Sequence, residues 1–380
     1  MKNLLESKKT AERKMEIVAE IGTSHGGDIE KAKKLIDTAV EAGADFVKFQ
    51  WVYAYEILHP ETGFVNLPGG KTRLYDRFKA LEMPKSFYKE CLDYTHEKGA
   101  KFMCSPFGLK SLEELLALNP DAVKIASPEL NHIPLLKSLA DFRKSKMIPA
   151  VISSGVSKLK DIERALEILG TENLTLLHCI TFYPAPEDEY NLRLIPNLSR
   201  IFGVQTGVSD HSLDPVLVPS LSCAVGGKMI EKHITLSKKT DGLDDPVALE
   251  GEQFAFMTHC VRQCEAVFRQ YGRDAENYII NQLKNEGGFS ERVEKCLGDG
   301  IKKLAPAEKE NYGRTNRSLH FLRGMKAGET VKKGDIGVLR TEKILTPGIH
   351  PDFLDEITGA KLEKDAKSGE GVTFAHFMRR

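Results

Sequence analysis

Residues 101–127, KFMCSPFGLKSLEELLALNPDAVKIAS, contain one complete unit of the fold. The runs at 101–106 and 122–127 are short, mostly apolar and bounded by small or polar residues, which is typical of buried strands. Between them, apolar residues recur at three- and four-residue spacing over 109–118, which predicts a helix. A strand, a helix and a second strand in this order indicate parallel strands joined by a crossover helix.

The same unit recurs along the chain. Strands are predicted at 17–22, 45–50, 101–106, 122–127, 149–154, 174–179, 205–210 and 228–234. Helices are predicted at 29–43, 85–99, 109–118, 133–142, 157–169, 191–202, 214–226 and 251–268. Eight such units favour a closed (β/α)8 barrel, with an open doubly wound sheet as the alternative. No GxGxxG follows the first strand, which weakens a dinucleotide-binding interpretation.

The alternating pattern stops after the eighth unit. Residues 270–315 are polar and contain several glycines, which indicates a linker or arm. Residues 317–340 then read as short strands broken by KAGE and KKGD turns. We therefore divide the chain into a barrel over 1–285, a linker arm over 286–315 and a small, strand-rich domain over 316–380.

Composition excludes several classes of protein. The 380 residues include 54 Lys and Arg and 54 Asp and Glu, so there is no basic excess for general nucleic-acid binding. No apolar run reaches the ~18 residues that a membrane span needs. The charged N-terminus lacks the apolar segment of a signal peptide, and the seven cysteines include no CxxC. These features predict a reduced, cytoplasmic protein.

Polar residues gather at the predicted strand ends, where the functional groups of such a barrel lie. The candidates are Glu20, Lys48, Gln50, Ser105, Lys124, Ser127, Glu129, Ser153, Thr181, Tyr183, Ser209, His211 and His233. A lysine inside a strand is desolvated and needs an anionic partner. Lys48 and Lys124, with the serine hydroxyls, therefore predict a pocket for a phosphorylated carboxylate. Structural ion pairs with Glu20 and Glu129 are the alternative.

Two histidines end neighbouring strands, in GVSDHS (207–212) and MIEKHI (229–234). Adjacent strands lie ~4.8 Å apart, so His211 and His233 could share one ion. Two imidazoles completed by carboxylates or water suit a transition metal such as Mn, Co, Fe or Zn better than Ca. A general acid–base histidine or a hydrogen-bonded core histidine remains open.

An ordered set of motifs spans nearly the whole chain. It comprises AEIGTSHGGD (19–28), AGADFVKFQ (42–50), CSPF (104–107), VKIASPEL (123–130), ISSGV (152–156), LLHCITFYPAP (176–186), GVSDHS, IEKHITL (230–236) and NRSL (316–319). Together they resemble the N-acetylneuraminate (sialic acid) synthase family. The resemblance implies a metal-dependent (β/α)8 barrel joined to a C-terminal antifreeze-like SAF domain. It also implies condensation of phosphoenolpyruvate with an N-acetylhexosamine, such as N-acetylmannosamine, to a nine-carbon 3-deoxy-2-keto acid and phosphate, with C–O cleavage.

The resemblance implies a role for each matching residue. His211 and His233 would ligate a divalent ion, Mn2+ in the first place, with Co2+ or Mg2+ as alternatives. Phosphoenolpyruvate would be held by Lys48, Lys124, Ser127, Ser153 and Ser209, joined by Ser105. The sugar or the metal region would be faced by Glu20, Gln50, Tyr183 and Asp244. Glu129 would also face the substrates, and Thr181 would be a further substrate-binding residue. Glu20 would stabilise the positive charge that develops at C2 of phosphoenolpyruvate, or transfer protons there. Arg317 resembles an arginine that one subunit places over its partner's active site, which implies a domain-swapped homodimer.

The sequence differs from the family pattern at positions where we expect one acceptor sugar to be distinguished from another. Residue 181 is Thr where Asn or Ser is common, and GLDD (242–245) replaces a common GPD, so the match of Asp244 is weaker. The acceptor could be N-acetylmannosamine, a diacetamido-trideoxyhexose of the legionaminic or pseudaminic type, or a spore-coat sugar precursor. Two other functions stay open: a Schiff-base aldolase that uses Lys124, and a non-catalytic carbohydrate-binding protein of spore-coat or surface polysaccharide assembly.

Overall fold

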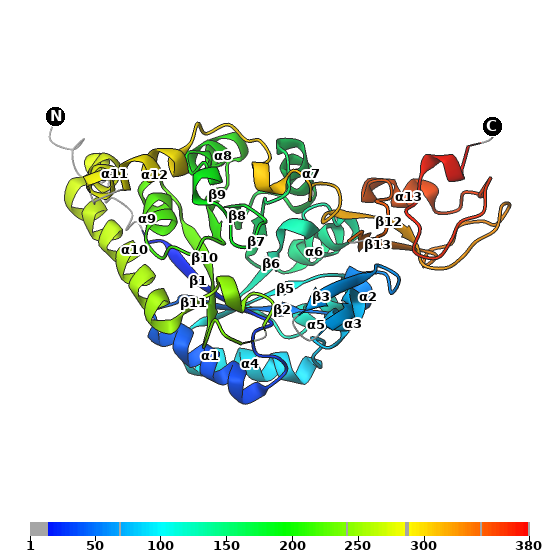
Figure 1. The fold of residues 1–380 in the computed structure, drawn as a ribbon, viewed down its shortest axis with the longest axis horizontal. Coiled ribbons are helices and arrows are strands. Elements are labelled where there is room, and N and C mark those ends of the chain that lie inside the picture. The colour runs from blue at the N-terminus through cyan, green and yellow to red at the C-terminus, as the bar shows by residue number, and fades with distance from the viewer. Residues whose placement is uncertain (1–13, 68–69, 241, 286–288, 343, 379–380) are drawn as a thin grey trace.

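The computed structural model describes residues 14–67, 70–240, 242–285, 289–342 and 344–378. Eight parallel strands form a closed barrel, because β1 pairs with β2 on one side and with β10 on the other (Figure 1). These strands are β1 (Glu16–Gly22), β2 (Phe46–Trp51), β5 (Lys101–Pro106), β6 (Ala122–Ile125), β7 (Ala150–Ser153), β8 (Leu174–Cys179), β9 (Gln205–Asp210) and β10 (Met229–Thr235). The predicted closed barrel is confirmed, and the open sheet is wrong.

Helices surround the barrel and bury their apolar faces against the strands (Figure 1). They are α1 (Ile29–Glu41), α4 (Lys85–Glu97), α5 (Leu109–Leu116), α6 (Ile133–Ser145), α7 (Leu159–Leu169), α8 (Leu194–Phe202), α9 (Leu217–Ala224) and α10 (Gly251–Tyr271). Inside the barrel, a layer of buried apolar side chains includes Val18, Phe46, Met103 and Leu177. This layer fills the barrel interior beneath the polar carboxyl ends of the strands.

Two segments differ from the sequence prediction. The segment between β2 and α4, for which no strand or helix was predicted, contains α2 (Ala54–Ile57), the hairpin β3 (Phe64–Leu67) and β4 (Gly70–Arg73), and α3 (Leu74–Lys79). The polar stretch after α10 contains α11 (Ala275–Asn285) and α12 (Phe289–Leu297). Helix α12 buries Val293, Cys296 and Leu297, whose spacing of three and four residues is helical although charged residues separate them.

The described part of the expected linker therefore begins with a helix packed on the barrel. After Leu297 it consists of irregular chain, turns and the short 3-10 helix η5 (Pro306–Glu308). The N-terminal 13 residues and the expected junction at 286–288 lie outside the described residues.

The small domain is built on an antiparallel pair, β12 (Arg317–Phe321) and β13 (Ile336–Arg340). Its own apolar core includes Leu319, Phe321 and Val372. It lies at the end of the molecule opposite α10 and α11, beside α6 and α2 (Figure 1). Ion pairs join it to its own barrel, Lys137–Asp355 and Arg164–Asp352, both at 2.8 Å. Across the described residues, no helix is both long enough and apolar enough to cross a bilayer.

Candidate active site

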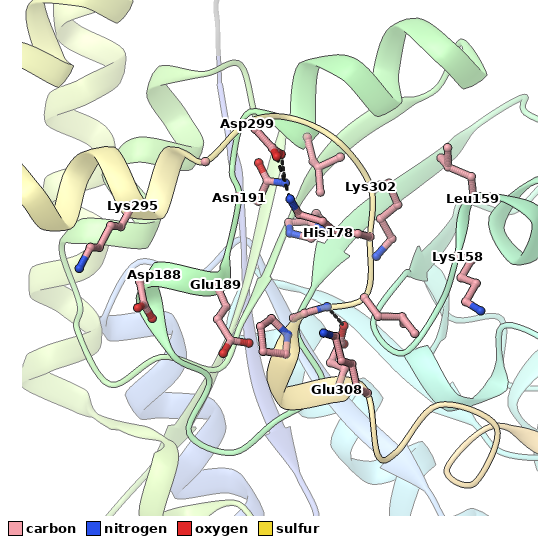
Figure 2. Close-up of a pocket in the computed structure, with 17 residues that line it drawn as sticks. Lys158, Leu159, His178, Asp188, Glu189, Asn191, Lys295, Asp299, Lys302 and Glu308 are labelled. Carbon is pink, nitrogen blue, oxygen red and sulfur yellow. Dashed lines mark hydrogen bonds and ion pairs between the residues drawn. The ribbon is translucent and has the colours of Figure 1, made fainter.

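A pocket of about 230 Å³ opens at the carboxyl ends of the barrel strands. The predicted site residues that line it are Glu20, Lys48, Gln50, Ser105, Lys124, Ser127, Ser153, Thr181, Tyr183, Ser209, His211, His233 and Asp244. A larger cavity of about 1050 Å³ lies beneath the linker, and none of the residues that line it belongs to the predicted set (Figure 2). The smaller pocket is therefore the candidate active site, because the chemistry-bearing side chains converge there.

The two lysines meet two carboxylates at the base of this pocket. Lys48 Nζ lies 2.6 Å from Glu20 Oε2 and 3.7 Å from Glu231 Oε2, and Lys124 Nζ lies 3.3 Å from Glu231 Oε1. Burial opposes the charged form of Lys48, but Glu20 and Glu231 outweigh it and raise its pKa. For Lys124, burial prevails over the attraction of Glu231 and lowers its pKa. The expected pair with Glu20 is present, but Lys124 pairs with Glu231 and not with Glu129.

Glu231 lines the pocket but was not among the predicted site residues. Burial opposes its charged form, but Lys124 and Lys48 hold its pKa well below the usual range, so the carboxylate stays ionised. It lies two residues before His233 in β10, and side chains two apart on a strand share one face. This two-residue spacing from His233 is the sequence feature from which the position of Glu231 could have been predicted.

Several hydroxyls face the same pocket. The Oγ atoms of Ser105 and Ser153 and the Oγ1 atom of Thr181 are buried and have no hydrogen-bond partner among the described residues. Buried hydroxyls in folded proteins are almost always paired. Two ammonium groups beside unpaired hydroxyl donors are suited to an anionic ligand with several oxygen atoms.

The two histidines come together as predicted, with ring centroids 5.6 Å apart. His211 Nδ1 lies 2.7 Å from the carbonyl oxygen of Ile180, so we assign its proton to Nδ1 and its lone pair to Nε2. That Nε2 lies 3.2 Å from the hydroxyl of Tyr183, whose ring stacks on His211. His233 Nδ1 lies 3.7 Å from Asp244 Oδ2.

The donor set decides which kind of metal site these histidines can form. Within the described part of the chain, no group of three or more His, Cys, Asp or Glu side chains could hold a metal. A closed structural site needs four protein ligands, so it does not fit. Two imidazoles do fit an ion whose other positions are taken by water or substrate, and the ion would displace the Tyr183 hydroxyl from His211 Nε2.

A third cluster of polar side chains, from Glu20, Gln50 and Asp244, lies around Gly22. Gln50 Nε2 donates a hydrogen bond to Glu20 Oε1 at 2.7 Å. A Cβ atom on Gly22 would lie 3.2 Å from Gln50 Nε2 and 3.6 Å from Asp244 Oδ2, and Gly22 has a φ of +59°. Glycine is therefore favoured here both by the backbone conformation and by the close approach. The structure thus places Asp244 in the pocket even though GLDD departs from the common pattern.

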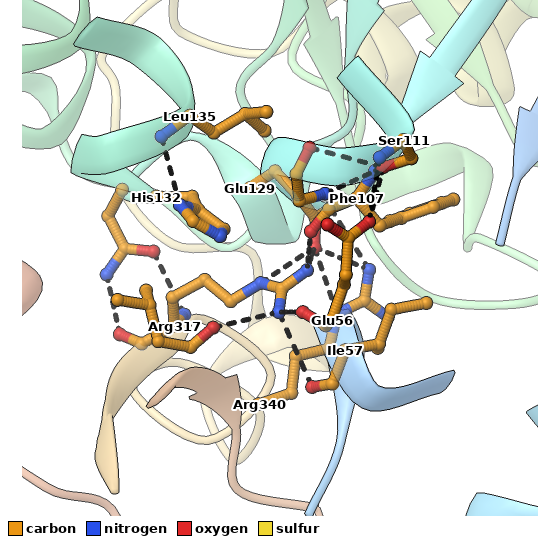
Figure 3. Close-up of polar contacts among 12 residues, drawn as sticks. Glu56, Ile57, Phe107, Ser111, Glu129, His132, Leu135, Arg317 and Arg340 are labelled. Atoms are coloured by element: carbon orange, nitrogen blue, oxygen red, sulfur yellow. Dashed lines mark hydrogen bonds and ion pairs between the residues drawn. The ribbon is translucent and has the colours of Figure 1, made fainter. Parts of the chain in front are cut away.

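Glu129 and Arg317 are the predicted residues that the structure does not bring into the pocket. The Arg317 side chain is 0% exposed, and its Nε and Nη2 donate to Glu129 Oε1 at 3.0 and 2.7 Å (Figure 3). The other hydrogen bonds of its side chain go to the carbonyl oxygens of Glu56, Ile57, Phe107 and Val338. Arg317 is thus occupied within its own chain and has no route to a substrate here.

Arg340, from the same small domain, lines the pocket of its own chain. It lies opposite Arg317 in the β12–β13 pair, and its Nη2 donates to both oxygens of Glu129, at 2.8 and 3.0 Å. Unlike Arg317, it lines the pocket, as do Phe78, Phe107 and Leu243. None of these four was predicted, because their placement depends on the docking of the small domain and of the loops after β2, β5 and β10.

Comparison with known proteins agrees with this geometry. The model of the NeuB family matches residues 35–272, and the model of the SAF domain matches residues 316–378. The N-acetylneuraminate-9-phosphate synthase of Drosophila melanogaster is 33% identical over 369 residues, which cover 94% of each chain. The N,N'-diacetyllegionaminic acid synthase of Campylobacter jejuni is 30% identical over 364 residues, covering 93% of this chain and 98% of that protein. The crystal structure of the spore coat polysaccharide biosynthesis protein spsE from Bacillus subtilis matches with a TM-score of 0.80 at 30% identity, over 97% of this chain and 96% of that one.

Proposed function

The chain belongs to the NeuB family, and we propose that it condenses phosphoenolpyruvate with an N-acetylated hexosamine. The products would be a nine-carbon 3-deoxy-2-keto sugar acid and inorganic phosphate. One observation carries the proposal: two buried lysines and unpaired hydroxyls lie beside a histidine pair in a single pocket. The names of the similar synthases support the same class of reaction.

In this proposal the pocket holds phosphoenolpyruvate by its two anionic groups. Lys48 and Lys124 offset the charge of its carboxylate and phosphate, and the hydroxyls of Ser105, Ser153 and Thr181 donate to their oxygens. Because these groups are buried, their attraction to the anion is stronger than it would be in water. The apolar layer below the strand ends prevents the anion from sinking deeper.

The acceptor sugar would lie on the side of Glu20, Gln50 and Asp244. A divalent ion held by His211 and His233, most simply Mn2+, would supply a Lewis acid for the sugar aldehyde. Carbon C3 of phosphoenolpyruvate bonds to the aldehyde carbon, and positive charge develops at C2. The Glu20 carboxylate stabilises that charge, water adds at C2, and Glu20 takes the proton of this water.

The bond between C2 and the phosphate oxygen then breaks, and the proton of the C2 hydroxyl passes to the departing phosphate, which leaves the 2-keto group. The proton on Glu20 is the one that the new hydroxyl group at the former aldehyde carbon requires, so the reaction balances without a further reactant.

A Schiff-base aldolase is the second candidate, because burial lowers the pKa of Lys124 and so favours its nucleophilic form. Against it, Lys124 already pairs with Glu231 at 3.3 Å, and the histidine pair would have no part in the reaction. Borohydride reduction in the presence of pyruvate separates the two. It traps a covalent adduct on Lys124 only if an imine forms.

The deciding experiment uses metal-stripped protein with phosphoenolpyruvate and a panel of N-acetylated hexosamines. The panel contains N-acetylmannosamine, its 6-phosphate and diacetamido-trideoxyhexoses, each with and without Mn2+, and phosphate release is measured. Release that needs both the metal and one sugar is expected. Protein that binds Mn2+ but releases no phosphate with any of these sugars would overturn this substrate class and favour a carbohydrate-binding role.

A further inference from the structure

The turn after β7 is strained and lies against the proposed anion subsite. Val156 has a φ of +41°, a conformation that a β-branched residue rarely adopts. A Cβ atom on the preceding Gly155 would lie 2.1 Å from Thr181 Oγ1 and 2.9 Å from Ser127 Oγ. The turn therefore packs tightly against two pocket hydroxyls, and Ser153, at its start, supplies another. Such strain persists only where surrounding contacts hold it.

The contacts that hold this turn come from the linker and from the first residue of the small domain. Glu308 Oε1 accepts the backbone N–H of Val156 at 2.7 Å and that of Thr181 at 2.8 Å. Lys302 Nζ donates to the carbonyl oxygen of Ser154 at 3.0 Å. Asn316 Nδ2 donates to the carbonyl oxygen of Val156, also at 3.0 Å. The strained residue is thus held at both its N–H and its carbonyl group by side chains far along the chain.

We propose that Glu308 is a positioning residue for the anion subsite. One oxygen atom of its carboxylate joins the turn after β7 to the end of β8, and so sets the separation between the hydroxyls of Ser153 and Thr181. Its side chain is 1% exposed, and hydrogen bonds to an ionised, buried carboxylate are among the strong ones. This role rests on the proposed function, since the ligand it orders is phosphoenolpyruvate.

The surroundings of Glu308 allow the role to be tested without loss of the fold. Glu308 and Lys302 form part of the wall of the cavity of about 1050 Å³ beneath the linker (Figure 2). In a Glu308→Ala variant, water from that cavity can solvate the two released N–H groups. The barrel then stays folded while the turn loses its restraint. Glu308→Gln keeps an oxygen acceptor at nearly the same place and serves as the conservative variant.

The experiment compares Glu308→Ala, Glu308→Gln and the exposed linker control Glu310→Ala. We expect Glu308→Ala to raise the KM for phosphoenolpyruvate at least tenfold, with a change of less than threefold in the KM for the sugar. Glu308→Gln should recover most of this loss, and Glu310→Ala should match the wild type. A purely structural role would lower the amount of active protein and leave both KM values unchanged.

A second readout does not depend on turnover. Amide hydrogen exchange at Val156 and Thr181 should be faster in Glu308→Ala than in the wild type and in Glu310→Ala. If the wild type releases no phosphate, the proposed function fails, and the exchange measurement still decides whether Glu308 restrains the turn. Unchanged exchange at both amides overturns the inference. In active protein, an unchanged KM for phosphoenolpyruvate or a Glu308→Gln variant as impaired as Glu308→Ala does the same.

Discussion

Replacing Glu231 by glutamine removes the carboxylate that compensates Lys124. Lys48 keeps Glu20 at 2.6 Å, but Lys124 has no second carboxylate within 4 Å among the described residues. At 3.3 Å and an effective dielectric constant of ~20, the lost attraction is ~5 kcal/mol. Breaking a buried pair from one side costs ~3–5 kcal/mol. We expect Glu231→Gln to lower the free energy of unfolding by about 3 kcal/mol or more at pH 7.

The pH dependence of this loss identifies its cause. Without Glu231, burial depresses the pKa of Lys124 further, so the unfolded chain binds more protons than the folded one at alkaline pH. Stability should therefore rise as the pH passes upward through the folded pKa of Lys124 toward that of a free lysine. The single tryptophan, Trp51, is buried in β2, so its fluorescence in urea reports unfolding of the barrel.

A double variant, Glu231→Gln with Lys124→Met, is the matched control, because it removes the uncompensated charge and keeps the volume. It should regain most of the lost stability and show little pH dependence. The reasoning is refuted if Glu231→Gln loses less than ~1 kcal/mol at pH 7, or if the double variant is no more stable than the single one.

Three further outcomes are expected. His211→Ala and His233→Ala should each weaken Mn2+ binding at least tenfold, measured by electron paramagnetic resonance of free Mn2+. An unchanged affinity would show that the two histidines do not bind the metal. Arg317→Met leaves Glu129 with Arg340 alone and should cost about 3 kcal/mol; denaturation that matches the wild type would contradict the buried ion pair. If the small domain of one subunit lies over the active site of the other, light scattering should find a homodimer. A monomer at all concentrations would exclude this domain-swapped arrangement.

Much of the barrel was predictable because its signal is local and repeated. The prediction of 101–106 coincides with β5, and the helix predicted at 109–118 contains α5. Helix α12 was missed for the opposite reason: charged residues surround three buried ones, so the average polarity of the segment hides its periodicity. The small domain yielded only its strand-rich character, because outside the β12–β13 pair its strand pairing consists of isolated bridges between residues far apart in the sequence, such as His320–Gly371 and Thr330–Lys361.

The site was predictable where the fold itself brings residues together. Parallel strands of a barrel end at one rim, so Lys48, Lys124, His211 and His233 could be assigned to one pocket once eight strands had been counted. Glu231 was within reach of the same argument, because it shares a face with His233. Within this chain Arg317 is held by Glu129 and four carbonyl groups, partners that could be found only from the packing. Its placement over a partner's active site stays a prediction.

Glu308 marks the limit of what the sequence can reveal. It accepts hydrogen bonds from residues 152 and 127 positions away along the chain, and in both cases the donor is a backbone N–H group. Nearly every residue carries such a group, so neither Val156 nor Thr181 indicates by its type that it needs a carboxylate partner. Glu308 itself lies in a polar, aperiodic segment where a glutamate is expected to be solvated. A residue whose partners are all backbone atoms has no pattern to match, and its burial is the first observation that points to a role.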